Sequence, residues 1–347
     1  MKLAIVIITY NAKKWFNLSI GSCLKYAPSV PLYVVDNNSP DNTASLIENE
    51  YPTVYLIKSA NNTGFAAGNN IGLKQALSAG AEAVLLLNQD AEITIGTLDN
   101  LQAYLETNPK VAAVQPVILL PDGTVNSIGN SFHYLGFAEA MGNGLSLAKA
   151  WSEIYGQAES AEPPYISGAA VLLRSAALRQ AGLFDEDLFM YHEDLELSLR
   201  FRLSGWHLGI IKNSLAIHHY QPERSKRQIY FMERNRYLVW LSYFKPATLV
   251  CLFLPAVMAE FVMLLTALIN GWLGAKLRTW NYLLSPSARD YLLQKKRQLK
   301  TFKPYRDRTL LRVASSRLSW QGDIWYMQIF NLVSRLAWRL IFPFVRW

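Results

Sequence analysis

Cysteine is nearly absent from this sequence, and so are the short motifs of the common nucleotide-binding folds. Its 347 residues include only two cysteines, Cys23 and Cys251, which lie far apart and lack metal-ligand spacing. This argues against a disulfide framework and is typical of a reducing compartment. No phosphate loop ending in Gly-Lys-Ser or Gly-Lys-Thr occurs, which argues against a P-loop nucleotidase. The glycines between Gly64 and Asn70 lack the Gly-x-Gly-x-x-Gly spacing of a dinucleotide-binding fold.

Positive charge is scarce in the first 275 residues and concentrated after them. Residues 1–275 carry 19 Lys and Arg against 23 Asp and Glu, whereas residues 276–347 carry 15 against 3. The front of the chain is therefore mildly acidic and the tail is strongly basic. Such a tail predicts binding to an anionic surface, either a membrane or a nucleic acid.

Apolar runs alternate with helical segments through the first half of the chain. The run Leu3–Ile8 is rich in β-branched residues and typical of a buried parallel strand. Strands alternating with helices predict an α/β protein with a doubly wound, mostly parallel sheet. Residues 126–162, rich in Gly, Ser and Ala, are interpreted as a mobile loop over the ligand crevice. Further strands are expected at residues 32–35, 54–57, 83–87, 111–120, 165–174, 207–211 and 216–219.

Polar residues follow three of these expected strands. Ligands of such sheets bind beyond the carboxyl ends of the strands, so three polar ends predict one crevice for a polar ligand. The segment Asn61–Asn70 is interpreted as a loop before a helix that runs to about Leu77, and it either flanks the ligand or is only a flexible lead-in. The polar residues at the strand ends are Thr9 and Asn11, then Asp36, then Asn88 and Asp90.

The stretch Phe184–Trp206 combines acidic residues with a helix. Leucine recurs every four residues from Leu195 to Leu203, which predicts one apolar helix face, and Gly205 ends the helix. Glu193 and Asp194 then lie in the first turn, where the helix dipole favours an ionised carboxylate at neutral pH. Such a carboxylate at the rim of a sheet is a candidate general base. The alternative is that both acids only cap the helix.

Taken in order and spacing, these motifs resemble the family-two glycosyltransferases with the GT-A fold. Within that family, the sequence is similar to the rhamnosyltransferase-like branch that builds bacterial surface glycans. The resemblance covers about the first 245 residues. The matching stretches are IVIITYNA (5–12), VVDNNSPDNT (34–43), NNTGFAAGNNIG (61–72), LLLNQDAEI (85–93), residues 167–206, the histidines at 218–219 and ERNRYLVWLSYF (233–244).

The resemblance implies an inverting transfer of a sugar, with rhamnose favoured, from a dTDP- or UDP-linked donor to a hydroxyl of a lipid-linked or cell-surface glycan. It implies that Asp194 deprotonates the acceptor hydroxyl. It also implies a divalent Mg²⁺ or Mn²⁺ at Asp90, with His218 as a further ligand, beside the diphosphate leaving group. The implied nucleotide-binding residues are Thr9, Tyr10, Asn11, Asp36, Asn38, Gly64, Asn69, Asn88 and Gln89.

Three features of the implied site leave alternatives open. The usual D-x-D motif is Asn88-Gln89-Asp90 here, and a single carboxylate supplies few of the oxygen ligands that a hard metal ion needs. In an extended strand His218 and His219 alternate faces, so at most one can face the crevice, and we favour His218. Arginines 234 and 236 either add positive charge near the diphosphate or are surface charge.

The tail predicts membrane association. Ala247–Leu273 is a long apolar stretch with a single charged residue, Glu260, and basic residues flank it on both sides, which argues against a single span under the positive-inside rule. We expect two helices broken near Pro255–Glu260 that lie in or dip into the inner leaflet, and a helix hairpin in a protein core is the alternative. Ile324–Trp347 is typical of an interfacial helix. Its many large apolar residues favour an anionic membrane surface over nucleic acid as the partner.

The sequence therefore predicts a GT-A glycosyltransferase domain at residues 1–245 and a helical, basic, membrane-associated region at 246–347. The expected location is the cytoplasmic face of a bacterial inner membrane, peripheral or monotopic, in cell-wall polysaccharide synthesis. A homo-oligomer is left open. One alternative is a polyprenyl-phosphate glycosyltransferase, whose acceptor needs no strong base. Another is a non-catalytic membrane scaffold, against which the intact Asp36, Asp90 and Asp194 argue.

Overall fold

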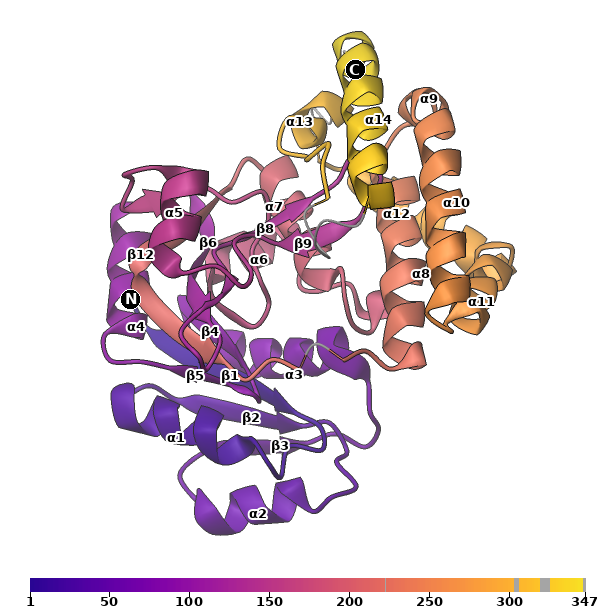
Figure 1. Ribbon diagram of the computed structural model, residues 1–347. Helices are drawn as coiled ribbons and strands as arrows, with labels where there is room; N and C mark the ends of the chain where they lie inside the picture. Colours follow the sequence, from indigo (N-terminus) through magenta and orange to yellow (C-terminus); the bar gives the residue numbers. More distant parts are fainter. Residues whose placement is uncertain (222, 303–305, 319–324, 346–347) are drawn as a thin grey trace. The chain divides into compact units, whose positions relative to one another are not determined.

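A computed structural model describes residues 1–221, 223–302, 306–318 and 325–345, and the chain divides into two units (Figure 1). The first unit comprises Met1–Asn130, Ala140–Phe189 and Glu193–Pro222. The second comprises Ser131–Glu139, Met190–His192 and Glu223–Trp347.

The first unit alternates strands and helices. Its strands are β1 (Leu3–Thr9), β2 (Leu32–Asp36), β3 (Tyr55–Lys58), β4 (Ala83–Asn88), β5 (Ala91–Ile93), β6 (Val111–Leu119), β7 (Val125–Ser127), β10 (Ser160–Ala161), β11 (Ala170–Arg174) and β12 (His207–His218). Its helices are α1 (Phe16–Tyr26), α2 (Thr43–Glu50), α3 (Gly64–Ser78), α4 (Thr97–Thr107), α5 (Leu147–Tyr155), α6 (Ser175–Ala181), the 3-10 helix η1 (Glu186–Leu188) and α7 (Glu193–Leu203).

The central sheet is mixed. Its strand order is β10-β12-β6-β11-β4-β1-β2-β3, with β5 paired to β12 and β7 to β6. The half formed by β3, β2, β1 and β4 is parallel, as expected. However, β11 runs antiparallel to both β4 and β6, so the sheet is mixed, while β6 and β12 beyond it are parallel to each other and run in the direction of β4. A buried antiparallel strand has the same apolar composition as a parallel one, and its sequence does not reveal its direction.

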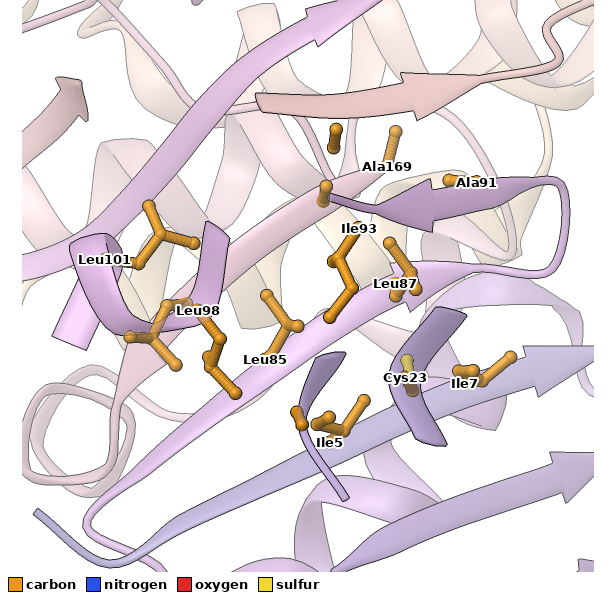
Figure 2. Packing of buried hydrophobic residues seen from close by; sticks show 14 of the residues in the cluster. Ile5, Ile7, Cys23, Leu85, Leu87, Ala91, Ile93, Leu98, Leu101 and Ala169 are labelled. Carbon is orange, nitrogen blue, oxygen red and sulfur yellow. The ribbon is translucent and has the colours of Figure 1, made fainter. Parts of the chain in front are cut away.

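Helices cover both faces of this sheet, because alternate strand residues point to opposite sides. Ile5 and Ile7 of β1 pack with residues of α1, α2 and α4. Figure 2 shows this layer. Cys23 of α1 lies beside Ile7, and Leu101 of α4 lies on the same face of the sheet. The intervening Ala4 and Val6 pack with residues of α3, α6 and α7 in a second core layer. The carboxyl ends of β1, β2 and β4 meet at one edge of the sheet.

The small-residue stretch expected as a loop is mostly helix, because α3 already begins at Gly64. Its glycines allow the helix to approach β1 closely. A Cβ atom at Gly68 would lie 1.9 Å from Ile8 Cδ1, and one at Gly72 would lie 2.4 Å from Val6 Cγ1. The glycines therefore serve helix–sheet packing rather than loop flexibility.

The interpretation of residues 126–162 as a mobile loop is also wrong. This range contains β7 and the helix α5, whose Trp151 is buried in a small apolar core with Val117 and Ile128. The Trp151 indole N–H donates to the Ala158 carbonyl oxygen at 2.6 Å. Likewise, the two strands expected at 207–211 and 216–219 are one strand, β12, with an irregularity between Ile211 and Leu215.

The second unit is mainly helical. It contains most of a small two-stranded sheet formed by β8 (Asn130–Phe132) and β9 (Ala138–Ala140). The first residue of β8 and the last residue of β9 belong to the first unit. Its helices are α8 (Lys226–Tyr243), α9 (Pro246–Cys251), α10 (Phe253–Ile269), α11 (Leu273–Leu283), α12 (Pro286–Leu299), α13 (Asp307–Leu311), α14 (Trp325–Ile341) and the 3-10 helix η2 (Phe342–Phe344).

The apolar stretch after residue 246 does form two helices, but the break lies at Leu252 and not near Pro255–Glu260. Pro255 sits in the first turn of α10, where a missing N–H removes no helical hydrogen bond. Within the described ranges, no helix has the length and apolar character that a membrane-spanning segment needs. The helix expected at Ile324–Trp347 is present as α14 and η2, and its end residues, Ile324 and Trp347, lie outside the described residues.

A buried cluster of charges joins three helices of the second unit. Lys276 of α11 is fully buried, and its Nζ lies 2.5 Å from Glu233 of α8 and 2.6 Å from Glu260 of α10. Arg236 of α8 contacts both carboxylates at 3.2 Å. These opposite charges hold the pKa of Glu233 down to about 2 despite its burial. Glu260 therefore interrupts the apolar stretch in order to pair with buried cations rather than to break a helix.

Candidate active site

The ends of β1 and β2 bring Thr9 and Asp36 side by side. The two residues are paired in the parallel ladder, and the Thr9 hydroxyl donates to Asp36 Oδ1 at 3.2 Å. The other carboxylate oxygen, Oδ2, accepts the backbone N–H of Ser39 at 3.0 Å. Both predicted nucleotide-binding residues are buried, and their hydrogen bonds fix the orientation of the Asp36 carboxylate.

The ends of β1 and β4 are joined through Tyr10 and Gln89. The Tyr10 backbone N–H donates to Gln89 Oε1 at 2.7 Å, and Gln89 Nε2 donates to the Tyr10 carbonyl oxygen at 3.2 Å. Asn11 and Asn38 both adopt positive φ angles, 53° and 61°, a region that asparagine tolerates better than most residues. These four predicted residues thus shape the loops at the edge of the sheet.

The start of α3 is fixed by Asn37, a residue that the motif analysis passed over. Asn37 Nδ2 donates to the Gly64 carbonyl oxygen at 3.1 Å, and its Oδ1 accepts the Thr63 backbone N–H at 2.9 Å. Gly64 has a φ of 84°, and a Cβ there would lie 2.5 Å from the Phe189 ring, so only glycine fits. The side chain of Asn69 is buried and donates back to the Phe65 carbonyl oxygen.

Asp90 follows β4 and lies beside His218 at the end of β12. Asp90 Oδ1 is 3.2 Å from His218 Nε2, and the other ring nitrogen, Nδ1, is 2.9 Å from Asn126 Oδ1. Two residues before Asp90, the buried Asn88 Oδ1 has no hydrogen-bond partner among the described residues. His219 points elsewhere, with its Nε2 2.9 Å from Glu92 Oε1 and its ring against Trp15. The structure therefore brings the side chain of His218, and not that of His219, to the Asp90 carboxylate.

Asp194 lies in the first turn of α7, as expected, and is partly buried. Its Oδ2 accepts the backbone N–H of Gly168 at 3.2 Å, and its Oδ1 accepts its neighbour Leu195 N–H at 2.7 Å. The residue after Gly168, Ala169, accepts the Asn88 backbone N–H at 2.9 Å. These bonds place the Asp194 carboxylate next to the end of β4 that carries the Asn88-Gln89-Asp90 motif.

The protonation of Asp194 differs from the sequence-based expectation. Burial raises its pKa to about 6, although hydrogen bonds from Gly168 and Leu195 oppose this shift. The helix-dipole argument predicted an easily ionised carboxylate, and desolvation outweighs it. Asp194 is still mostly ionised at pH 7. For the adjacent Glu193, burial and the negative charge of Asp194 raise the pKa well above its usual range, which favours the neutral acid.

The turn before α7 is strained. Phe189, Tyr191 and His192 all have φ angles between 62° and 67°, which are rare for residues with bulky side chains. In the first unit, the Phe189 carbonyl oxygen accepts the Ala66 N–H at 3.1 Å. In the second unit, Asn235 of α8 donates to the carbonyl oxygens of Met190 and Tyr191, each at 2.8 Å. Backbone strain of this kind is held by surrounding contacts and is common next to functional groups.

Arg234 and Arg236 are buried residues of the second unit, so the surface-charge alternative is wrong for both. Arg236 is paired with Glu233 and Glu260. Arg234 lies over the ring of Phe231 at 4.9 Å and over that of Tyr282 at 5.2 Å.

Three groups at this edge of the first unit were not identified from the sequence. Asn37 lies within the matching stretch 34–43 but was given no role there, and Asn126 is a lone asparagine; the partners of both are distant in sequence, so spacing could not identify them. The Gly168 N–H is a backbone group, and only the fold shows that it faces Asp194.

Comparisons with known proteins identify the family of this chain. Residues 4–181 match the family model described as Glycosyl transferase family 2. An N-acetylglucosaminyl-diphospho-decaprenol L-rhamnosyltransferase of Mycobacterium tuberculosis is 29% identical over 233 residues, which cover 62% of this chain and 76% of that protein. The dTDP-rhamnosyl transferase RfbF of Shigella flexneri is 27% identical over 215 residues, which cover 61% of this chain and 67% of that protein.

A solved structure with a similar fold covers most of the chain. The mannosyltransferase PcManGT from Pyrobaculum calidifontis, in complex with GDP-Man and Mn²⁺, aligns with a TM-score of 0.50 at 17% identity and covers 96% of this chain and 86% of that one. The mixed sheet flanked by helices is thus GT-A-like. On the family match over residues 4–181 and the two rhamnosyltransferase relatives, this chain belongs to glycosyl transferase family 2, on its rhamnosyltransferase-like branch.

Proposed function

We propose that this glycosyltransferase moves rhamnose from a dTDP-linked donor to a hydroxyl of a lipid-linked glycan, with inversion at the anomeric carbon. The observation that carries this proposal is the hydrogen-bonded position of the Asp194 carboxylate next to the Asn88-Gln89-Asp90 end of β4. The relatives named for rhamnosyl transfer support the choice of sugar, and the decaprenol-linked substrate in one of those names supports the acceptor class.

Asp194 acts as the general base in this proposal. Its pKa of about 6 leaves it ionised at pH 7 and still basic enough to accept a hydroxyl proton during attack. The acceptor oxygen forms a bond to the anomeric carbon as its proton moves to Asp194. The bond from that carbon to the diphosphate oxygen breaks on the opposite face, and the nucleoside diphosphate leaves with the electron pair. One displacement at one carbon inverts its configuration.

The donor nucleotide is proposed to bind at the ends of β1, β2 and β4. Asp36 is positioned by Thr9 and Ser39 to accept hydrogen bonds from the ribose or the base. Tyr10, Asn11 and Asn38 lie in the adjoining loops. The proposed set also includes Gly64, Asn69, Asn88 and Gln89, of which Gly64 begins α3 and Asn88 ends β4.

A divalent ion, Mg²⁺ or Mn²⁺, is proposed at Asp90 and His218. The residues fit such an ion, because a carboxylate oxygen and a ring nitrogen face each other at 3.2 Å, and two residues before Asp90 the Asn88 Oδ1 has no hydrogen-bond partner among the described residues. When bound, the ion neutralises charge on the diphosphate leaving group. Among the described residues no group of three or more His, Cys, Asp or Glu side chains could hold a metal, so the remaining ligands come from the diphosphate and water.

The direct test is transfer by the purified full chain. We expect label from dTDP-rhamnose to appear in a polyprenyl-diphospho-N-acetylglucosamine acceptor. Transfer to polyprenyl phosphate that survives Asp194→Asn would favour the polyprenyl-phosphate alternative instead. Failure to bind dTDP-rhamnose, UDP-sugars and GDP-sugars in calorimetry would favour the non-catalytic scaffold.

We also propose that residues 246–347 attach the enzyme to an anionic membrane at the cytoplasmic face, and that residues 1–245 are the catalytic domain. Large apolar side chains of α10 remain exposed at helical spacing, including Leu254 (68%), Phe261 (62%) and Leu265 (43%). In α14, Leu332, Leu336 and Leu340 are exposed in the same way. An exposed apolar face within a strongly basic region suits the surface of a lipid bilayer.

Vesicle sedimentation tests this attachment. The double variant Phe261→Ser and Leu265→Ser should bind vesicles with phosphatidylserine less tightly, because burying each such side chain is worth about 1.5–3 kcal/mol. Ile95→Ser is the matched control, since Ile95 is an exposed apolar residue of the first unit (84%). Equal binding by the double variant and the control would contradict the proposed face.

A further inference from the structure

Asn126 is a buried residue of β7 whose side chain contacts His218. Its Oδ1 lies 2.9 Å from His218 Nδ1, and both side chains are more than nine-tenths buried. The backbone around it is fixed as well. β7 pairs with β6, and the Asn126 carbonyl oxygen accepts a hydrogen bond from Asn143 Nδ2 at 3.1 Å. Asn126 thus presents its amide to His218 from a held position.

This contact determines which nitrogen of His218 carries the hydrogen. An amide oxygen can only accept, so His218 Nδ1 must be the protonated nitrogen that donates to it. A neutral imidazole has only one N–H, so the lone pair of Nε2 then points at Asp90 Oδ1, 3.2 Å away. Two acceptors that face each other at this distance need a cation or a proton between them.

We propose that Asn126 is a positioning residue for the divalent metal, because it fixes the His218 tautomer that binds the metal through Nε2. The inference rests on the metal site of the proposed function and adds a residue to it. A ligating histidine commonly donates its other ring N–H to an oxygen that fixes its orientation, and loss of that partner typically weakens metal binding by ~10–100-fold. His219 has no such arrangement, since its Nε2 contacts Glu92.

Mn²⁺ binding to the full chain, followed by electron paramagnetic resonance in the presence of dTDP, tests the proposal. Asn126→Ala should weaken Mn²⁺ binding by ~10–100-fold. Asn126→Asp, which keeps an acceptor oxygen, should restore it. Asn143→Ala is the matched control, because it removes a hydrogen bond to the same β7 backbone and does not contact His218. The Mn²⁺ affinity of this control should stay within about twofold of that of the wild type. When His218 is already replaced by Gln, adding Asn126→Ala should not weaken Mn²⁺ binding further.

Equal Mn²⁺ affinity in Asn126→Ala and wild type would overturn the proposal, as would equal weakening by Asn143→Ala. Nitrogen-15 NMR of the metal-free wild type gives a result that does not depend on how the variants fold. We expect the His218 ring hydrogen on Nδ1, with the signal assigned through His218→Gln, and a hydrogen on Nε2 instead would refute the tautomer. If the wild type binds no Mn²⁺ with dTDP yet transfers sugar in chelator, the metal role fails while the transfer reaction stands.

Discussion

Replacing the Asp194 carboxylate with an amide isolates its role as a base. Asp194→Asn keeps the shape of the side chain and one acceptor oxygen, which can accept from either the Gly168 or the Leu195 N–H, whereas the two carboxylate oxygens of Asp194 accept one each. It removes the proposed base, so turnover should fall by ~10²-fold or more. Donor affinity should change little, because Asp194 is not among the residues proposed to bind the nucleotide. Initial rates with saturating donor and acceptor measure the first effect, and calorimetry with dTDP measures the second.

The pH dependence of the wild type follows from the same carboxylate. With a pKa of about 6, Asp194, the proposed base, is ionised above that pH and becomes protonated below it. We therefore expect the rate to fall about tenfold from pH 7 to pH 5. Asp187→Asn, which changes an exposed acid in the same stretch, should keep both the rate and this profile. A flat profile in the wild type, or near-normal turnover in Asp194→Asn, would refute the assignment.

The contribution of Asp194 to protein stability should change with pH in the direction opposite to the rate. The folded state raises the Asp194 pKa above its ordinary value of 3.8, so it holds the proton more tightly than the unfolded chain does. The resulting contribution to stability is present below pH 4 and is lost as pH rises through about 6. The shift corresponds to ~3 kcal/mol. As pH rises from 4 to 8, the free energy of unfolding of Asp194→Asn should therefore increase relative to that of the wild type by up to that amount. Urea unfolding at each pH measures this difference.

Other parts of the chain give further expectations. Asp90→Ala should abolish the rise in Mn²⁺ affinity that dTDP causes in calorimetry, and an unchanged rise would remove Asp90 from the metal site. Gly72→Ala should destabilise the chain by ~1–3 kcal/mol because its Cβ would meet Val6 at 2.4 Å. Gly274→Ala is its control, because no atom lies within 4 Å of the added Cβ. Lys276→Met should destabilise the chain by ~3–5 kcal/mol, because Glu233 and Glu260 would lose one of their two buried cations and keep only Arg236, and an unfolding midpoint near that of the wild type would contradict this.

The sequence predicted the parallel half of the sheet and the place of Asp194 at the start of α7. Both features depend on local patterns, namely apolar runs that end in polar residues and a leucine repeat that ends at a glycine. The glycines of α3 were misread as a loop because sequence alone does not distinguish a glycine needed for flexibility from one needed for close packing. Gly68 and Gly72 are required by Ile8 and Val6, which lie 60 and 66 residues away in the chain.

Long-range contacts account for the remaining differences. Asn126 and His218 are 92 residues apart, and their hydrogen bond exists only because β7 and β12 both pair with β6. Burial also reversed the expected effect on Asp194, since a helix dipole lowers a carboxylate pKa modestly whereas desolvation raises it more. Glu260 was misread as a helix interruption because its partners, Arg236 and Lys276, lie on other helices.

The anomeric configuration of the product tests the central claim most directly. The full chain, supplied with dTDP-rhamnose and a lipid-linked N-acetylglucosamine acceptor, should form a rhamnoside whose anomeric configuration, read from the one-bond carbon–hydrogen coupling in NMR, is inverted relative to the donor. Asp194→Asn under the same conditions should form little product. A product with retained configuration would contradict a single displacement assisted by Asp194, and so would inverted product formed equally fast by the variant.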